Sequence, residues 1–290
     1  LLSIMDGVYN ADHCHIFLLT TNKLKVNDNL ISRPSRIRYL KSFGDVIDRK
    51  ILEYSPSDGF LSFREKLVGY YDQYQIKLTA DDIIITSGGS EAVLFAFMSC
   101  LNPGDEIIVP EPAYANYMAF AVSAGAVIRP ITSTIDEGFA LPSIEKFEEL
   151  INERTRGILI CNPNNPTGYL YTRKEMNRIR DLVKKYDLYL FSDEVYRECI
   201  YTGSPYISAC HLEGIEQNVV LIDSVSKRYS ECGIRIGALI TKQAVNGIFG
   251  AGHFKANIQP VLLADKTENI VFKHMQSLLA ISRGGWFRAQ

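Results

Sequence analysis

A lysine placed between hydroxyl side chains and an arginine is the most informative group in the sequence. Lys227 lies in residues 223–228, DSVSKR, directly after an apolar run, and Arg235 follows in the segment GIRIG. A lone lysine is usually a solvated surface charge. Here Ser224, Ser226 and Arg235 can bind a phosphate group, while the lysine amine can form a covalent bond with a nearby aldehyde. The segment therefore predicts a site for a small phosphorylated carbonyl compound.

A carboxylate at the end of an apolar run gives a second candidate. Asp193 lies in residues 191–196, FSDEVY, with Tyr196 three positions later. A carboxylate at the end of a buried strand needs a cationic or hydrogen-bonding partner. A protonated heterocyclic nitrogen would satisfy Asp193, and so would an ordinary helix cap, so both interpretations stay open at this point.

Two turns with restricted backbones also follow apolar runs. Residues 86–92, TSGGSEA, place Gly88, Gly89 and Ser90 between a predicted strand and a predicted helix at 93–100. Glycine allows close approach of an anion, and a helix N-terminus offers free N–H groups, although a tight turn would look the same. Residues 162–168, NPNNPTG, form a rigid loop that can direct the Asn165 amide at a ligand.

The elements around these segments predict an α/β fold. Between about residues 60 and 242, amphipathic segments alternate with short apolar runs, as in helices that cross over a mostly parallel sheet. Helices are expected at 63–71, capped by Ser62, and at 143–150. Strands are expected at 83–86, 107–109, 158–161, 189–191, 219–222 and 236–240. Ligands of such sheets bind at the carboxyl ends of the strands, which is where the candidate residues lie.

Composition limits the class of protein. The 290 residues are 47% hydrophobic and 22% charged, which excludes a disordered or fibrous chain. A net charge of -2 gives no electrostatic basis for binding nucleic acid or an anionic membrane, so we expect a small-molecule partner. The six cysteines are irregularly spaced, and no leader or apolar span is evident, which favours the cytoplasm. We expect no metal site, and interpret residues 12–15, DHCH, as a solvated segment.

The ordered motifs resemble a known family. GGSEA, EPAY, NPNNPTG, SDEVY, SxSK and GIRIG occur in this order between about residues 50 and 242. Together they resemble the class I/II aminotransferases of pyridoxal-phosphate (PLP) fold type I, most closely the aspartate aminotransferase group. The resemblance implies a three-layer αβα large domain with a mostly parallel sheet.

The resemblance also implies roles for individual residues. Lys227 would form the internal aldimine with PLP, Asp193 would pair with the pyridine nitrogen, and Tyr114 would stack on the ring. Tyr196 and Asn165 would contact the ring oxygen. The phosphate would be bound by Gly89, Ser90, Ser224 and Arg235, and by Tyr54 of a neighbouring subunit in a homodimer. Gly88 and Ser226 complete the set of cofactor-binding residues.

The two ends of the sequence are expected to differ from the family. Residues 1–50 form a segment of unclear type, 51–242 the PLP-binding large domain, and 243–290 an atypical tail in which the family's small domain is missing or truncated. Arg283 and Arg288 do not match the family's carboxylate-binding arginine. The resemblance implies amino-group transfer between an acidic amino acid such as aspartate and a 2-oxo acid. A PLP-dependent β-eliminating lyase and a PLP-binding protein without efficient turnover are the alternatives.

Overall fold

The computed structural model describes residues 55–230 and 232–242. The chain divides into two compact units, residues 1–58 and 59–290, and the fold below is that of the second. The predicted N-terminal segment, Tyr54 and the predicted tail at 243–290 lie outside the described residues. Among the residues that are described, no helix has the length and apolar character needed to cross a membrane.

The described strands form one seven-stranded sheet. Their bounds are β1 Ile83–Thr86, β2 Glu106–Glu111, β3 Val127–Thr132, β4 Thr155–Cys161, β5 Tyr189–Asp193, β6 Val219–Ser224 and β7 Gly237–Ile240. The strand order is β1-β7-β6-β5-β4-β2-β3. Only β7 is antiparallel to its neighbours, β1 and β6, whereas the other pairs are parallel. The predicted mostly parallel α/β fold is confirmed.

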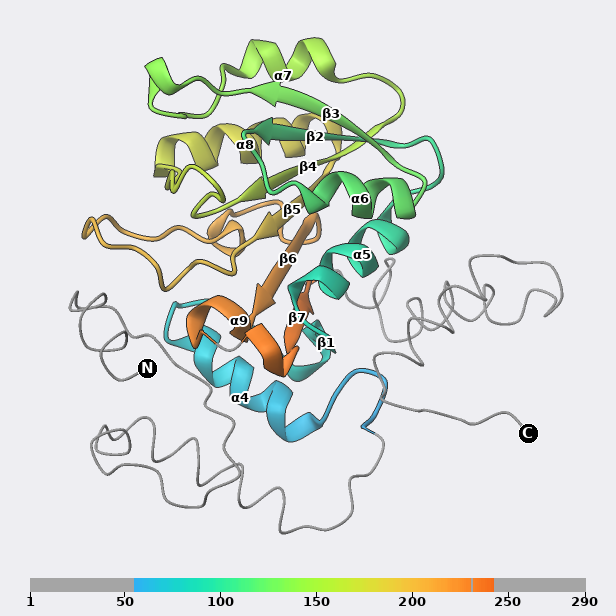
Figure 1. Ribbon diagram of the computed structural model, residues 1–290, viewed down its shortest axis with the longest axis vertical. Coiled ribbons are helices and arrows are strands. Elements are labelled where there is room, and N and C mark those ends of the chain that lie inside the picture. The colour runs from blue at the N-terminus through green and yellow to red at the C-terminus, as the bar shows by residue number, and fades with distance from the viewer. Residues whose placement is uncertain (1–54, 231, 243–290) are drawn as a thin grey trace, which may run out of the picture. The chain divides into compact units, whose positions relative to one another are not determined.

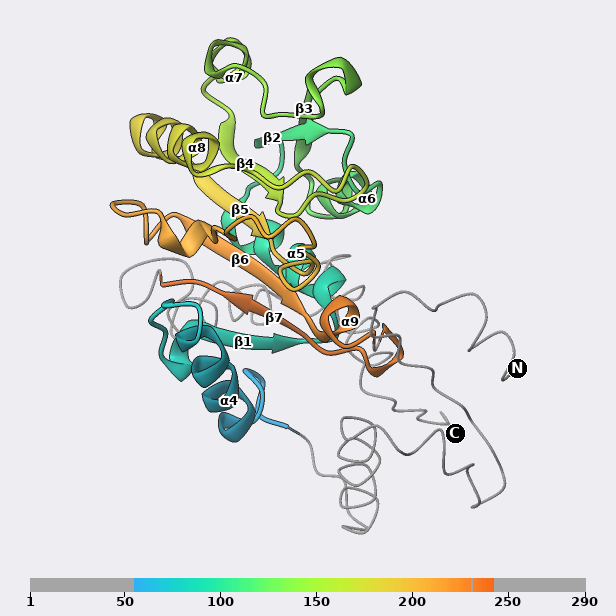
Figure 2. The same ribbon diagram turned by 90° about the vertical axis from the view of Figure 1, so that its left-hand side faces the viewer.

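Helices cover both faces of this sheet (Figures 1 and 2). The α-helices are α4 Leu61–Asp72, α5 Gly89–Cys100, α6 Asn116–Ser123, α7 Ile144–Leu150, α8 Arg173–Tyr186 and α9 Val225–Arg228. Short 3-10 turns occur at η1 Ala80–Asp82, η2 Ile135–Glu137, η3 Ala209–His211 and η4 Cys232–Ile234. Helices α4, α7 and α8 lie on one face and α5 and α6 on the other, as Figure 2 shows edge-on.

Alternation along the strands builds a separate apolar core on each face. In β4, Ile158 and Ile160 pack into the core under α7 and α8, whereas Leu159 packs with α5 and α6. The period of two follows from strand geometry, and burial on both faces explains why the central strands are continuous apolar runs. The layers hold the carboxyl ends of β4, β5 and β6 at one edge of the sheet.

Two local expectations differ from the structure. Helix α4 begins at Leu61 and has no side-chain cap, so the predicted cap at Ser62 is wrong. The carbonyl oxygen of Phe60 accepts the N–H groups of Phe63 and Arg64 at 3.0 and 3.1 Å, which places Ser62 inside the first turn.

Strand β3 was not predicted because its sequence, VIRPIT, contains an arginine and a proline. As the last strand of the sheet it is largely exposed, so it carries little apolar signal.

Candidate active site

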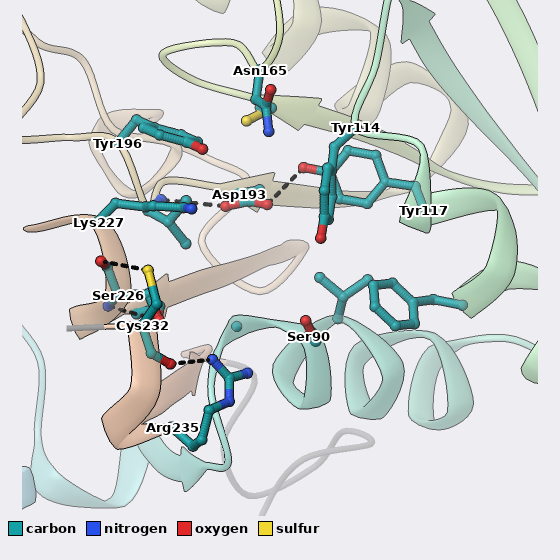
Figure 3. Close-up of a pocket in the computed structure, with 16 residues that line it drawn as sticks. Ser90, Tyr114, Tyr117, Asn165, Asp193, Tyr196, Ser226, Lys227, Cys232 and Arg235 are labelled. Atoms are coloured by element: carbon teal, nitrogen blue, oxygen red, sulfur yellow. Dashed lines mark hydrogen bonds between the residues drawn. The ribbon is translucent and has the colours of Figure 1, made fainter. Parts of the chain in front are cut away.

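A pocket of about 160 Å³ lies at the carboxyl ends of the parallel strands. Ten of the twelve residues predicted from the sequence line it: Gly89, Ser90, Tyr114, Asn165, Asp193, Tyr196, Ser224, Ser226, Lys227 and Arg235. Figure 3 labels eight of them, all but Gly89 and Ser224, and shows them converging from separate elements. Gly88 forms the turn immediately before Gly89, and Tyr54 lies outside the described residues. The structure therefore brings together residues up to 147 positions apart in the sequence, from Gly88 to Arg235.

The glycine turn between β1 and α5 is shaped by an arginine. Gly88 has φ of 86°, and a Cβ atom there would lie 2.3 Å from Nη2 of Arg235. That guanidinium donates from Nη2 to the Ser87 carbonyl oxygen at 3.3 Å and from Nη1 to the Cys232 carbonyl oxygen at 2.8 Å. Helix α5 begins at Gly89, so its first N–H groups and the guanidinium face the same space. This combination suits an anion such as a phosphate group.

The lysine lies on a helix of a single turn. Ser224 caps α9, and its Oγ accepts the N–H of Ser226 at 3.1 Å. Lys227 is exposed, and its Nζ lies 5.7 Å from the centre of the Tyr196 ring. In Figure 3 the Lys227 side chain runs alongside Tyr196, and its amine end points toward Asp193. A primary amine is thus placed at the mouth of the pocket, where a small ligand can reach it.

Asp193 is the buried acid of the site. Its Oδ2 accepts a 2.6 Å hydrogen bond from the Tyr117 hydroxyl, and its Oδ1 accepts the N–H of Val195 at 3.3 Å. Burial raises the pKa of Asp193 to about 6, although the two hydrogen bonds act in the opposite direction. Asp223 and Glu194, both negatively charged, contribute to the rise. A positively charged ligand beside Asp193 would favour its ionised form.

The sequence reasoning missed three polar or sulfur-containing residues that line the pocket, namely Tyr117, Cys161 and Cys232. Tyr117 is buried at the start of α6, and its ring meets that of Tyr114 edge-on at 5.4 Å. The spacing of three between the two tyrosines was the available signal, because the N–H of Tyr117 bonds to the Tyr114 carbonyl oxygen at 3.0 Å in the turn that leads into α6. Burial raises the pKa of the Cys161 thiol, so this cysteine stays protonated.

The fold and the pocket define an α/β protein whose ligand site joins a reactive amine, a buried acid and an anion-binding turn. Residues 15–279 match the family described as Aminotransferase class I and II, so the chain belongs to this family. The match extends beyond residues 50–242, where the motifs that carry the resemblance are found.

The names of similar proteins agree with this family. The chain is 34% identical over 197 residues to an aspartate aminotransferase of Thermotoga maritima, covering 67% of this chain and 51% of that protein. It is 33% identical over 193 residues to a putative aminotransferase of Bacillus subtilis, covering 66% of this chain and 50% of that protein. The matched part thus spans about half the length of these relatives.

Solved structures show the same architecture. The aspartate aminotransferase of Thermotoga maritima matches with a TM-score of 0.71 and 27% identity, over 87% of this chain and 64% of that chain. The Thermus thermophilus enzyme with maleate matches with a TM-score of 0.68 and 25% identity, over 84% and 62% of the two chains.

Proposed function

We propose that this protein is a PLP-dependent aminotransferase that moves the amino group between an acidic amino acid such as aspartate and a 2-oxo acid. One observation supports it most: Lys227, Asp193 and the Gly88–Gly89 turn with Arg235 meet at a single pocket. Each of the three matches a different part of one cofactor, namely its aldehyde, its ring nitrogen and its phosphate.

The pocket residues fit PLP. The Arg235 guanidinium fills the position that a Cβ atom of residue 88 would take, so a glycine at 88 lets this cation lie against the turn, which suits a phosphate. Asp193 is a buried carboxylate whose pKa is raised to about 6, and a pyridinium nitrogen would supply the cation that it lacks. Tyr114 lies beside the pocket with an aromatic face that can stack on the ring, while Asn165 and Tyr196 supply polar groups at its other side.

The protein groups have separate tasks in the proposed reaction. When bound, PLP supplies an electron sink that makes loss of the α-proton of an amino acid feasible. Asp193 keeps the ring nitrogen protonated by placing a negative charge beside it. The Lys227 amine would hold the cofactor and, once free, would accept the α-proton of the substrate and later give it up again. Because α9 fixes the backbone of Lys227, both transfers occur within one short range of movement.

Two comparisons support an acidic substrate. A relative at 34% identity is named an aspartate aminotransferase, and the Thermus structure contains maleate, a dicarboxylate. A further relative, at 29% identity, is named an aromatic-amino-acid aminotransferase. Arg235 is the one arginine among the described residues of the pocket, and it adjoins the glycine turn. No second arginine that could bind the substrate carboxylate lines the pocket within residues 55–230 and 232–242.

We also propose a homodimer in the cytoplasm. The family resemblance supports the dimer, in which the partner's Tyr54 would reach the phosphate. The five cysteines that the structure describes are all free thiols, which is consistent with a reducing compartment.

A spectroscopic half-reaction tests the proposal. The protein is saturated with PLP, aspartate is added without a 2-oxo acid, and the absorbance spectrum and the released product are followed. We expect conversion of the cofactor to the pyridoxamine form with one equivalent of oxaloacetate. The Lys227→Ala variant should show no conversion on the same timescale. Release of ammonia without the pyridoxamine form would contradict amino transfer and indicate elimination.

A further inference from the structure

The residue after the lysine faces away from the pocket. Lys227 is exposed at the pocket, whereas the side chain of Arg228 is only 5% exposed. Nη2 of Arg228 lies 2.6 Å from both carboxylate oxygens of Asp223. Its guanidinium carbon lies 3.9 Å from the centre of the Tyr70 ring, on α4. A charged side chain is therefore taken out of water directly beside the proposed cofactor lysine.

Asp223 is held from several directions. Besides Arg228, its Oδ2 accepts the Tyr71 hydroxyl at 2.6 Å, and its Oδ1 accepts the N–H of Ser224 at 2.8 Å. The Arg197 guanidinium lies 3.9 Å from Oδ2. Although burial acts to raise the pKa of Asp223, the two arginines outweigh it and hold the pKa below its usual value. Asp223 is thus an ionised carboxylate that joins β6, α4 and α9.

The ion pairs around Asp223 continue to Glu194, the residue that follows Asp193. Arg197 donates from Nη2 to Glu194 at 3.1 Å, and both side chains are fully buried. The four side chains Glu194, Arg197, Asp223 and Arg228 therefore form an alternating series of charges, which we call the buried charge chain. Glu194 follows Asp193 in the sequence, and Arg228 follows Lys227. Each end of the buried charge chain is thus one residue from a group that lines the pocket.

We propose that Arg228 is a positioning residue, which fixes Lys227 by binding Asp223 at the end of β6. This inference rests on the proposed function, in which Lys227 carries the cofactor. A helix of four residues cannot hold its own shape in water. The ion pair between Arg228 and Asp223 ties this turn to the sheet, and Tyr71 ties the same carboxylate to α4.

The test replaces Arg228 by Gln or by Lys in the full chain. The matched control is Arg154→Gln, which removes an arginine from another buried carboxylate, Glu106, at 2.8 Å. Arg154 precedes β4 and so lies at the amino end of the strands, opposite the pocket. Two quantities are measured: amide hydrogen exchange of residues 224–230 in cofactor-free protein, and the rate at which borohydride traps PLP on Lys227.

For Arg228→Gln we expect faster exchange at residues 224–230, unchanged exchange in β4 and β5, and trapping on Lys227 slowed by about tenfold or more, since small displacements of a reacting group cost this much. Arg228→Lys keeps a cation opposite Asp223 and should restore part of the rate. Arg154→Gln should leave both quantities at their wild-type values.

Three outcomes would overturn the positioning role. Wild-type exchange and trapping in Arg228→Gln would show that the pair does not fix the lysine, and equal losses in the Gln and Lys variants would show that charge is not what matters. If Arg228→Gln does not fold, Tyr71→Phe is used instead, because it removes one donor to Asp223. Tyr71→Phe should also speed exchange at residues 224–230 and slow trapping, by smaller amounts. Wild-type exchange and trapping in Tyr71→Phe would contradict the positioning role. By contrast, wild-type protein that traps no PLP on Lys227 contradicts the proposed function itself.

Discussion

At the scale of single residues, two opposing requirements act on the protonation state of Asp193. In the cofactor-free protein its burial favours the protonated acid, whereas the proposed role beside a pyridinium nitrogen needs the carboxylate. The positive charge of the bound cofactor would therefore offset the cost of burying the ionised Asp193 carboxylate. This gives a stability prediction that is independent of catalysis.

We expect Asp193→Asn to stabilise the cofactor-free protein at pH 7.5. The pKa is about 6 in the folded chain against an ordinary aspartate value of 3.8. The folded state therefore binds more protons between these values, and its stability falls as pH rises through them. Removing the charge should add about 1–3 kcal/mol to the free energy of unfolding at pH 7.5 and little near pH 4. Urea unfolding at the two pH values measures this. Equal effects at both would contradict the raised pKa.

Tyr117→Phe is expected to weaken PLP binding without disturbing the fold. The hydroxyl donates to Asp193 and favours its ionised form. Its loss should therefore weaken the binding free energy of PLP by about 1 kcal/mol, which is roughly fivefold in affinity. Fluorescence titration with PLP measures the change. Tyr186→Phe is the matched control, because it removes a hydroxyl at the end of α8 that donates to Glu148 on α7. An unchanged affinity in Tyr117→Phe would show that Tyr117 does not act on Asp193.

The sequence allowed prediction of residues that belong to motifs, but not of their partners. Lys227 and Asp193 could be predicted because motifs fix their neighbours along the chain. Tyr117 reaches Asp193 from 76 positions away, and Tyr71 reaches Asp223 from 152. Contacts of this kind depend on how α4 and α6 pack on the sheet, which no local pattern determines.

At the scale of elements, the strands were predicted well because burial on both faces gives continuous apolar runs. The edge strand β3 and the start of α4 were not, because exposure removes the apolar signal of β3 and a backbone carbonyl replaces a side-chain cap at α4. The turn before α5 shows the reverse case. There Gly88, visible in the sequence as part of a glycine pair, is required by the side chain of Arg235, which lies between β6 and β7 in the sequence.

Gly88→Ala is expected to weaken PLP binding far more than it weakens the fold. A Cβ atom there would lie 2.3 Å from the Arg235 guanidinium, which must move away from the turn. Gly104→Ala is a close control, because Gly104 has φ of 88° against 86° for Gly88, with nothing within 4 Å of its Cβ position. Both should lose similar stability, about 1 kcal/mol or more, while only Gly88→Ala should lose affinity for PLP. Similar affinities would contradict a phosphate site at this turn.

At the scale of the whole molecule, PLP should act as a stabilising ligand. A ligand that binds only the folded state adds about 2.7 kcal/mol at 100 times its dissociation constant. We expect the thermal midpoint of the wild-type chain to rise with PLP concentration, and the rise to be much smaller in Lys227→Ala, which retains the fold but not the covalent bond. Calorimetry at several PLP concentrations measures both. A midpoint that PLP raises equally in the two proteins would contradict the role of Lys227.

The central claim is that Lys227 holds PLP in this pocket, and one chemical measurement tests it directly. The protein is incubated with PLP, reduced with borohydride, digested and mapped by mass spectrometry. The predicted result is a single reduced pyridoxyl group on Lys227, absent from the same peptide of Lys227→Ala. Attachment to any other lysine, or no attachment in the wild-type chain, would contradict the proposed site and the function built on it.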